Sequence, residues 1–151
     1  MRKSSATAAA LAALIACAGA QAQRPAHTLE LRATYCVAVL QYELALFNSM
    51  PADTPPEIQG GIAEEEFRAS ENLKRLQAFL KPRIASINPA DLAMALESGD
   101  GDAQRAVLEA SRCVESCADD AHPEACRQRC KQRSEVLQRV GICADTSWYP
   151  I

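Results

Sequence analysis

The chain has 151 residues, of which 48% are hydrophobic and 23% are charged, and its formal net charge is −3. If residues 1–22 are removed as a leader, Arg2 and Lys3 are lost, and 14 basic residues remain against 19 acidic ones, a net charge of −5. A chain of this size is expected to form a single domain. Its negative charge argues against nucleic acid or an anionic membrane as the partner, so a protein partner is expected.

Residues 1–22 have the features of an export signal that resembles those of Gram-negative bacteria. A basic start at Arg2-Lys3 is followed by an apolar stretch over residues 6–16 and then by small residues. This stretch is shorter than the roughly 20 apolar residues that a transmembrane helix needs, and no later stretch is as long, so no transmembrane segment is expected.

Two cleavage sites compete in this leader. Ala20-Gln21-Ala22 fits ordinary signal peptidase, which would leave residues 23–151 as a periplasmic or secreted domain. Leu14-Ile15-Ala16-Cys17 instead resembles a bacterial lipobox, in which residues 1–16 are removed and Cys17 is lipidated. The second alternative predicts an outer-membrane lipoprotein with a lipid anchor at Cys17.

After the leader, apolar residues recur at helical spacing, which predicts an all-α fold of about five helices. The first helix is expected from Leu29 to Ser49, with Thr28 as its N-cap. The segment from Pro51 to Gly61 is rich in proline and glycine and predicts a loop. A second helix is expected from Ile62 to Leu80, followed by Pro82.

The second half of the chain predicts three more helices. A short one is expected from Pro89, with Asn88 as its N-cap, to Gly99. Asp102 is expected to cap the fourth helix, which carries Cys113 and Cys117. The fifth is expected from Pro123 to Val140, with Gly141 ending it in the left-handed conformation.

Four cysteines near the C-terminus have mirrored spacing: a C-x3-C pair, eight residues, and a second C-x3-C pair. A spacing of four places both thiols of a pair on one face of a helix. In an antiparallel helical hairpin the equal offsets align Cys117 with Cys126 and Cys113 with Cys130. The sequence therefore predicts a helical hairpin that is cross-linked by two disulfides.

Six cysteines remain once Cys17 is removed with the leader or lipidated, and an even number in an exported chain indicates a disulfide framework. With four of them in the hairpin, Cys36 is left to pair with Cys143. We therefore expect a disulfide-linked helical bundle with a C-terminal helical hairpin.

The twin C-x3-C arrangement of residues 113–130 resembles the α-hairpinins of plants and the small translocase chaperones of the mitochondrial intermembrane space. The resemblance implies the same disulfide pairing, outer cysteine with outer and inner with inner. It covers this motif alone, and we treat it as convergence on one geometry. Protease inhibition and chaperone activity are therefore not carried over to this chain.

The same four cysteines allow a competing hypothesis, a metal-binding or thiol-redox protein. Four thiolates, with His122 between the pairs, would suit tetrahedral zinc. However, structural zinc favours C-x2-C spacing, exported thiols normally form disulfides, and thiol oxidoreductases use C-x-x-C. The chain carries no recognisable nucleophile motif, so we expect no enzyme, no metal and no cofactor.

Two surface features are candidates for partner binding. The fifth predicted helix is rich in basic residues, which include Arg127, Lys131 and Arg133, on an otherwise acidic chain. Trp148, the only tryptophan, lies in the C-terminal tail, where it either packs on the core or anchors an interface. The sequence thus predicts an exported, non-enzymatic binding protein of the bacterial envelope, of the inhibitor, immunity or assembly-factor type.

Overall fold

The structure, a computed structural model, describes residues 28–51, 53, 56–145 and 148, so both predicted cleavage sites and Cys17 lie outside it. Its helices are α1 (Thr28–Asn48), α2 (Pro56–Leu80), the short 3-10 helix η1 (Ile84–Ser86), α3 (Pro89–Ser116), α4 (Pro123–Arg133) and α5 (Glu135–Gly141). The described residues form five α-helices and no strand, which confirms the predicted all-α fold. Within these ranges, no helix has the length and apolar character needed to cross a membrane.

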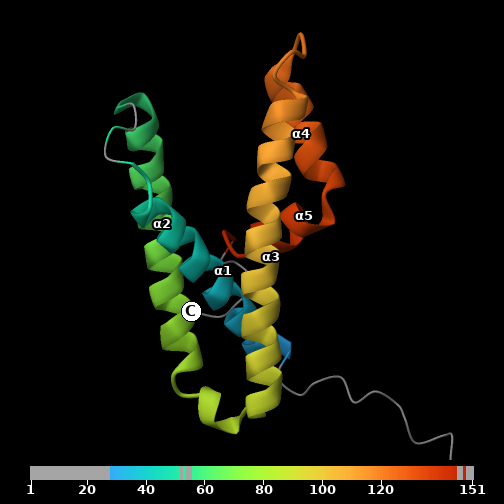
Figure 1. Cartoon of the computed structure of the whole chain (residues 1–151). Helices are drawn as coiled ribbons and strands as arrows, with labels where there is room; N and C mark the ends of the chain where they lie inside the picture. Colours follow the sequence, from blue (N-terminus) through green and yellow to red (C-terminus); the bar gives the residue numbers. More distant parts are fainter. Residues whose placement is uncertain (1–27, 52, 54–55, 146–147, 149–151) are drawn as a thin grey trace, which may run out of the picture.

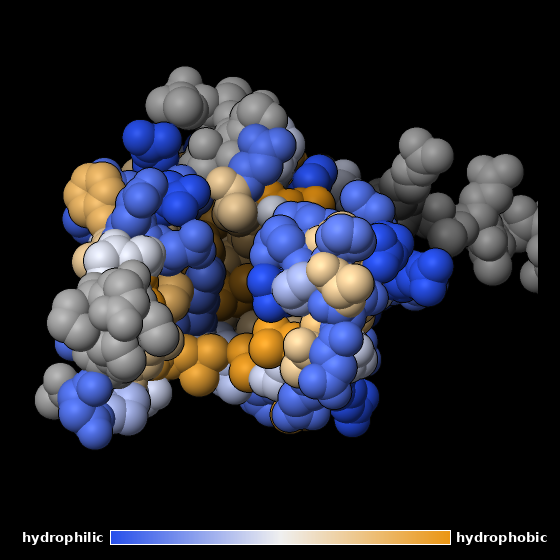
Figure 2. All heavy atoms as spheres, turned by 90° about the horizontal axis from the view of Figure 1, so that it is seen from above, coloured by the Kyte–Doolittle hydropathy of each residue, from blue (hydrophilic) through white to orange (hydrophobic). Residues whose placement is uncertain are grey.

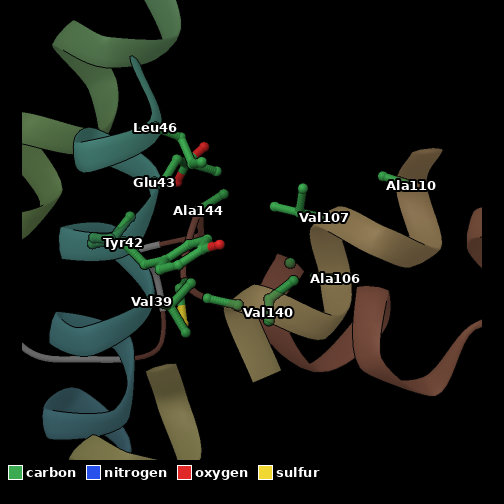
Figure 3. Close-up of a pocket in the computed structure, with 13 residues that line it drawn as sticks. Val39, Tyr42, Glu43, Leu46, Ala106, Val107, Ala110, Val140 and Ala144 are labelled. Carbon is green, nitrogen blue, oxygen red and sulfur yellow. The ribbon is translucent and has the colours of Figure 1, made fainter. Parts of the chain in front are cut away.

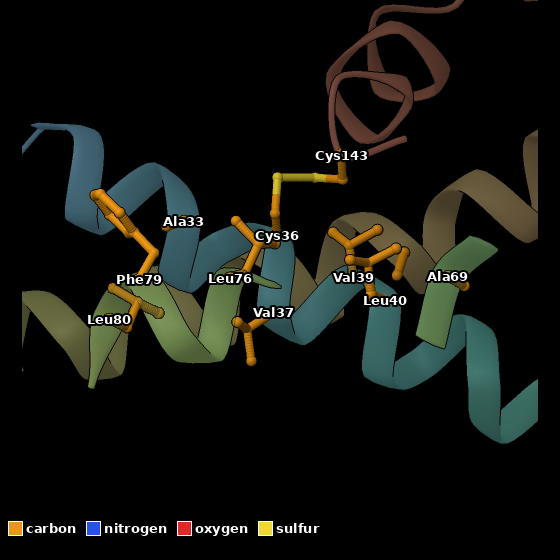
Figure 4. Packing of buried hydrophobic residues seen from close by; sticks show 11 residues of the cluster. Ala33, Cys36, Val37, Val39, Leu40, Ala69, Leu76, Phe79, Leu80 and Cys143 are labelled. Carbon is orange, nitrogen blue, oxygen red and sulfur yellow. A yellow bond between two sulfur atoms is a disulfide. The ribbon is translucent and has the colours of Figure 1, made fainter. Parts of the chain in front are cut away.

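The central helix is α1, which packs against both α2 and α3 (Figure 1). Its residues 33–40 are all buried except the half-buried Tyr35. A helix that is covered on all sides needs no polar face. Leu40 of α1 and Leu76 of α2 are the largest of the fully buried side chains, and Phe79 and Leu80 extend this core along α2 (Figure 4).

Helix α2 begins at Pro56, which corrects the predicted loop that extended to Gly61. Proline is suited to the first position of a helix, because the N–H group that it lacks has no partner there. Gly60 and Gly61 lie in the second turn and are exposed. Each glycine costs the helix about 1 kcal/mol relative to alanine, and the packing of residues such as Leu76 outweighs that cost.

One continuous helix, α3, replaces the two that the sequence predicted on either side of residues 99–102. Asn88 caps its start as predicted, because its Oδ1 accepts a hydrogen bond of 2.8 Å from the backbone N–H of Ala90. Gly99 does not end a helix. It lies where α3 crosses α1, and a Cβ atom there would be 2.3 Å from the carbonyl oxygen of Tyr35.

Asp102 is likewise not an N-cap, because its buried carboxylate joins three helices. Its Oδ2 accepts hydrogen bonds from the Tyr35 hydroxyl of α1 at 3.0 Å and from Nε of Arg139 of α5 at 2.9 Å. Arg105, one turn further along α3, donates to Oδ1. The Arg139 hydrogen bond is the main cause that lowers the pKa of Asp102 to about 2, against the effect of burial. Burial, followed by the hydrogen bond to Asp102, raises the pKa of Tyr35 to about 12.

The fifth predicted helix is divided at Ser134 into α4 and α5. Ser134 has extended backbone angles, φ −85° and ψ 112°, and its Oγ accepts a hydrogen bond from the N–H of Leu137, so it caps α5. The break turns α5 away from the direction of α4 and allows Val136 to be buried. Gly141 is the last residue of α5, and no described glycine has a positive φ, which corrects its predicted left-handed conformation.

The three predicted disulfides are all formed. Cys113–Cys130 and Cys117–Cys126 each have a Cα–Cα distance of 5.7 Å, and Cys36–Cys143 has one of 5.2 Å, within the ordinary range for a disulfide. The first two hold α4 against the C-terminal end of α3. The third connects the residues after α5 to the middle of α1 (Figure 4). The chain thus forms the expected disulfide-linked bundle with a C-terminal hairpin.

Candidate functional site

The C-terminal halves of α1 and α3 separate and leave a groove between them, which we call the α1–α3 groove. Its volume is about 260 Å³. The side chains that point into it from the two helices, shown in Figure 3, are Tyr42, Glu43 and Leu46 of α1 and Ala106, Val107 and Ala110 of α3. Of the described residues that line it, only Glu43 is charged.

The floor of the groove comes from the residues at and after the end of α5. Val140 and Ala144 line it beside Cys143, which is bonded to Cys36 in the core. The carbonyl oxygen of Ala144 accepts a hydrogen bond of 3.3 Å from the side-chain amide of Asn72 on α2. A disulfide and a hydrogen bond to a second helix therefore fix the floor in place.

The groove stays open because the wall on α3 is made of small residues. Ala103, Ala106 and Ala110 recur at helical spacing on that wall, so no large side chain reaches across to α1. Val107 extends the apolar wall outward and is 37% exposed. Seen from above in Figure 2, the molecule is hollowed between the α2 side and the α3–α4 side, with hydrophobic residues along the floor of the hollow.

Glu43 gives the groove its electrostatic character. Its half-buried carboxylate forms no hydrogen bond or ion pair within the part of the chain that the structure describes. Burial raises its pKa, and the negative charge of Glu65 on α2 raises it further, while Arg68 lowers it. Arg68 is itself paired with Glu65 at 3.1 Å and lies 3.7 Å from Glu64. The Glu43 carboxyl group is therefore half-buried without a cation of its own, since the nearby Arg68 is paired with the carboxylates of α2.

The predicted basic face is partly neutralised by the chain itself. Arg127 pairs with Glu124 at 2.7 Å, and Arg129, on the same helix, lies 3.8 Å from Asp120. Lys131 and Arg133 are exposed, and neither forms an ion pair with a described residue. Two cations of the predicted set thus remain available to a partner, and they lie on α4, outside the α1–α3 groove.

Trp148 is partly buried and packs against the hydrophobic core. Its Nε1 donates a hydrogen bond of 3.1 Å to the carbonyl oxygen of Ile142, and the guanidinium of Arg32 lies 4.4 Å from the centroid of its ring. The sequence left open whether Trp148 packs on the core or anchors an interface, and these contacts are those of a side chain packed on the core. They give the indole a role in holding the C-terminal segment against α1.

The four hairpin cysteines offer no thiolate, because all of them are in disulfides. A metal site would require those sulfurs to be free thiolates, whereas a thiol-redox role would require one of these disulfides to exchange with a thiol. Across the described ranges, no cluster of three or more His, Cys, Asp or Glu side chains is placed to hold a metal ion.

The sequence did not single out Tyr42, Glu43 or Val107, although it carried a signal for them. Tyr42 and Leu46 are four residues apart in the first predicted helix, so they share one of its faces. Alanine also recurs along one face of residues 103–110. What the sequence could not show is that the C-terminal halves of α1 and α3 diverge, because that depends on where the helices cross.

Comparison with protein-family models, curated proteins and solved structures finds no match to this chain. The groove is therefore judged by its own chemistry. It combines apolar walls, one half-buried carboxylate and a floor that is fixed by a disulfide. Such a surface is suited to receiving apolar side chains from another molecule.

Proposed function

We propose that this chain is an exported, non-enzymatic protein-binding module of a bacterial envelope and that the α1–α3 groove is its docking surface. The observation that carries the proposal is this open apolar groove, which leaves Val107 of α3 and Tyr42 of α1 partly exposed on its two sides. An inhibitor, an immunity protein or an envelope assembly factor would each use such a surface on one dedicated partner.

The disulfides support this proposal in two ways. Three of them in one small domain are typical of proteins that are delivered to an oxidising compartment. They also fix the floor of the groove and the arm made by α3 and α4. A preformed surface loses little conformational entropy on binding, so more of the contact energy appears as affinity.

The basic face on α4 is the competing docking surface on the same protein. It is less favoured because Arg127 is already paired with Glu124 and only Lys131 and Arg133 remain without an ion pair among the described residues. Exposed charges on a helix are weakly desolvated on docking and contribute more to association rate than to affinity. An apolar groove contributes to affinity directly.

Site-specific photocrosslinking in the native envelope tests the proposal. A photoreactive phenylalanine analogue is placed at Val107, which lines the groove, and separately at the adjacent Leu108, which is 59% exposed on another face of α3. A third variant carries the analogue at Lys131. We expect a discrete adduct with another protein from position 107 and none from position 108. If only position 131 forms an adduct, the docking surface lies on α4 instead of in the groove. If none of the three positions forms an adduct, the proposal is contradicted.

A further inference from the structure

We infer that the partner segment in the α1–α3 groove is an amphipathic helix whose apolar face carries a lysine or arginine that pairs with Glu43. This inference rests on the proposed function and specifies the chemistry of the partner. It commits to a helix from another protein and excludes a small molecule or a second copy of this chain.

The first argument is charge. Among the described residues that line the groove, Glu43 is the only charged one, and none of the described chain is hydrogen-bonded to it or paired with it. Glu64, Glu65 and Glu66 lie close together on α2, and Glu65 acts on Glu43 directly. Arg68 is paired with these carboxylates rather than with Glu43. A segment that buries this part of the groove either brings its own cation or buries the Glu43 carboxyl group without one, ionised or protonated, and the cation avoids that cost.

The second argument is the length of the apolar wall. From Ala103 through Val107 to Val114, side chains spaced by about one or two turns share one face of α3. Val114 is 53% exposed, so the wall continues beyond the part that encloses the groove. At 1.5 Å per residue this face is roughly 16 Å long, which matches about three turns of a docked helix. A small molecule would cover only part of it.

The third argument concerns shape. The wall of alanines on α3 faces the larger side chains Tyr42 and Leu46 on α1. Such a groove between two helices accepts the ridge of a third helix, with apolar side chains at positions i, i+3 or i+4, and i+7. A second copy of this chain is disfavoured by charge, because the chain carries a net charge of −3 with its leader and −5 without it.

The inference predicts which helices the protein selects from a library. The probe is a displayed library of single helices that are randomised along one face, selected on the purified, disulfide-intact protein. We expect the selected helices to be apolar at helical spacing with one Lys or Arg on that face. Selection on Glu43→Lys is expected to replace this cation by Asp or Glu. For one selected peptide, Glu43→Gln is expected to weaken binding by about tenfold or more, measured by fluorescence anisotropy.

Matched variants separate the groove from the rest of the surface. Glu97→Gln removes an exposed carboxylate on the N-terminal half of α3 and should leave peptide affinity unchanged. Val107→Asp should abolish binding, whereas Leu108→Asp should not. Circular dichroism and the thermal midpoint of each variant show that the fold is retained.

In the peptide experiments, three results would overturn the inference: recovery of the same helices with wild type and Glu43→Lys, binding that survives Val107→Asp, or no enrichment of any helix. These outcomes are distinct from failure of the proposed function. Position 107 could form an adduct in the envelope while the selected helices show no preference for a cation. In that case the groove remains the docking surface, and only the inference of a cationic helix is overturned. An adduct between two copies of this chain would identify the occupant as a second copy and would also overturn the inference.

Discussion

Asp102 and Glu43 are two carboxylates with opposite surroundings. Asp102 accepts hydrogen bonds from Tyr35 of α1, Arg105 of α3 and Arg139 of α5, and the pKa of Asp102 is lowered. Glu43 has no such donor within the described chain, and the pKa of Glu43 is raised. The ionised form of Asp102 therefore stabilises the fold, while the ionised form of Glu43 costs stability at neutral pH. A carboxylate in such surroundings is a candidate for function.

The Asp102 cluster predicts that the protein loses stability in acid. The pKa of Asp102 falls from an ordinary value of 3.8 to about 2 in the folded state. Because the folded pKa is the lower one, the stabilisation is complete above about pH 4 and is lost as the pH falls from 4 to 2. The side chain is only 4% exposed, and the lowering corresponds to about 2 kcal/mol. Asp102→Asn should lower the free energy of unfolding at pH 7 by roughly this amount, measured by urea denaturation.

The control for this prediction is Asp100→Asn, on the same helix. Asp100 is exposed and accepts a hydrogen bond only from the side chain of Gln104 among the described residues. The Asp100 variant should keep the acid dependence of the wild type, while the Asp102 variant should show a flatter dependence between pH 4 and 2. Equal acid dependence in wild type and Asp102→Asn would show that other carboxyl groups control acid unfolding.

At the scale of the helices, the crossing of α1 and α3 predicts opposite effects for two glycines that are two residues apart. A Cβ at Gly99 would meet the backbone oxygen of Tyr35 at 2.3 Å, so Gly99→Ala must push α3 away from α1. We expect a loss of about 1–3 kcal/mol. At Gly101 the nearest atom is in the Arg105 side chain at 3.9 Å, so Gly101→Ala should stabilise α3 by up to about 1 kcal/mol. The free energy of unfolding of both variants is measured by thermal or urea unfolding. If both substitutions changed it in the same direction, the prediction would be contradicted.

This crossing also explains which helices could be predicted from the sequence. The Asn88 cap and the pairing of the four hairpin cysteines depend on local spacing, and both are confirmed. The cap predicted at Asp102 is wrong, because its carboxylate instead accepts hydrogen bonds from α1 and α5. Gly99 was misread because glycine is typical both of a helix end and of a close helix contact, and only the position of α1 distinguishes the two. Ser134 was missed because its break depends on where α5 packs, a long-range condition.

For the molecule as a whole, the disulfides determine which parts can move relative to one another. α2 and the arm formed by α3 and α4 lie apart, and α1 connects them (Figure 1). The bond between Cys36 and Cys143 fixes the groove floor to α1, while the two hairpin disulfides stiffen the arm. The α1–α3 groove is therefore open without being loosely held, which is the property that a docking surface needs.

The disulfides predict a ranking of stability losses. Cys36–Cys143 spans 107 residues of sequence, against 17 and 9 for the hairpin bonds. In the chain-entropy model the long link stabilises the fold by about 5 kcal/mol and the outer hairpin link by about 3, and the inner one adds less because it lies within a closed loop. Paired Cys→Ala variants should therefore lose most stability for 36/143 and least for 117/126, measured by guanidinium unfolding. If the 117/126 variant lost the most, local packing of the hairpin rather than loop entropy would control stability.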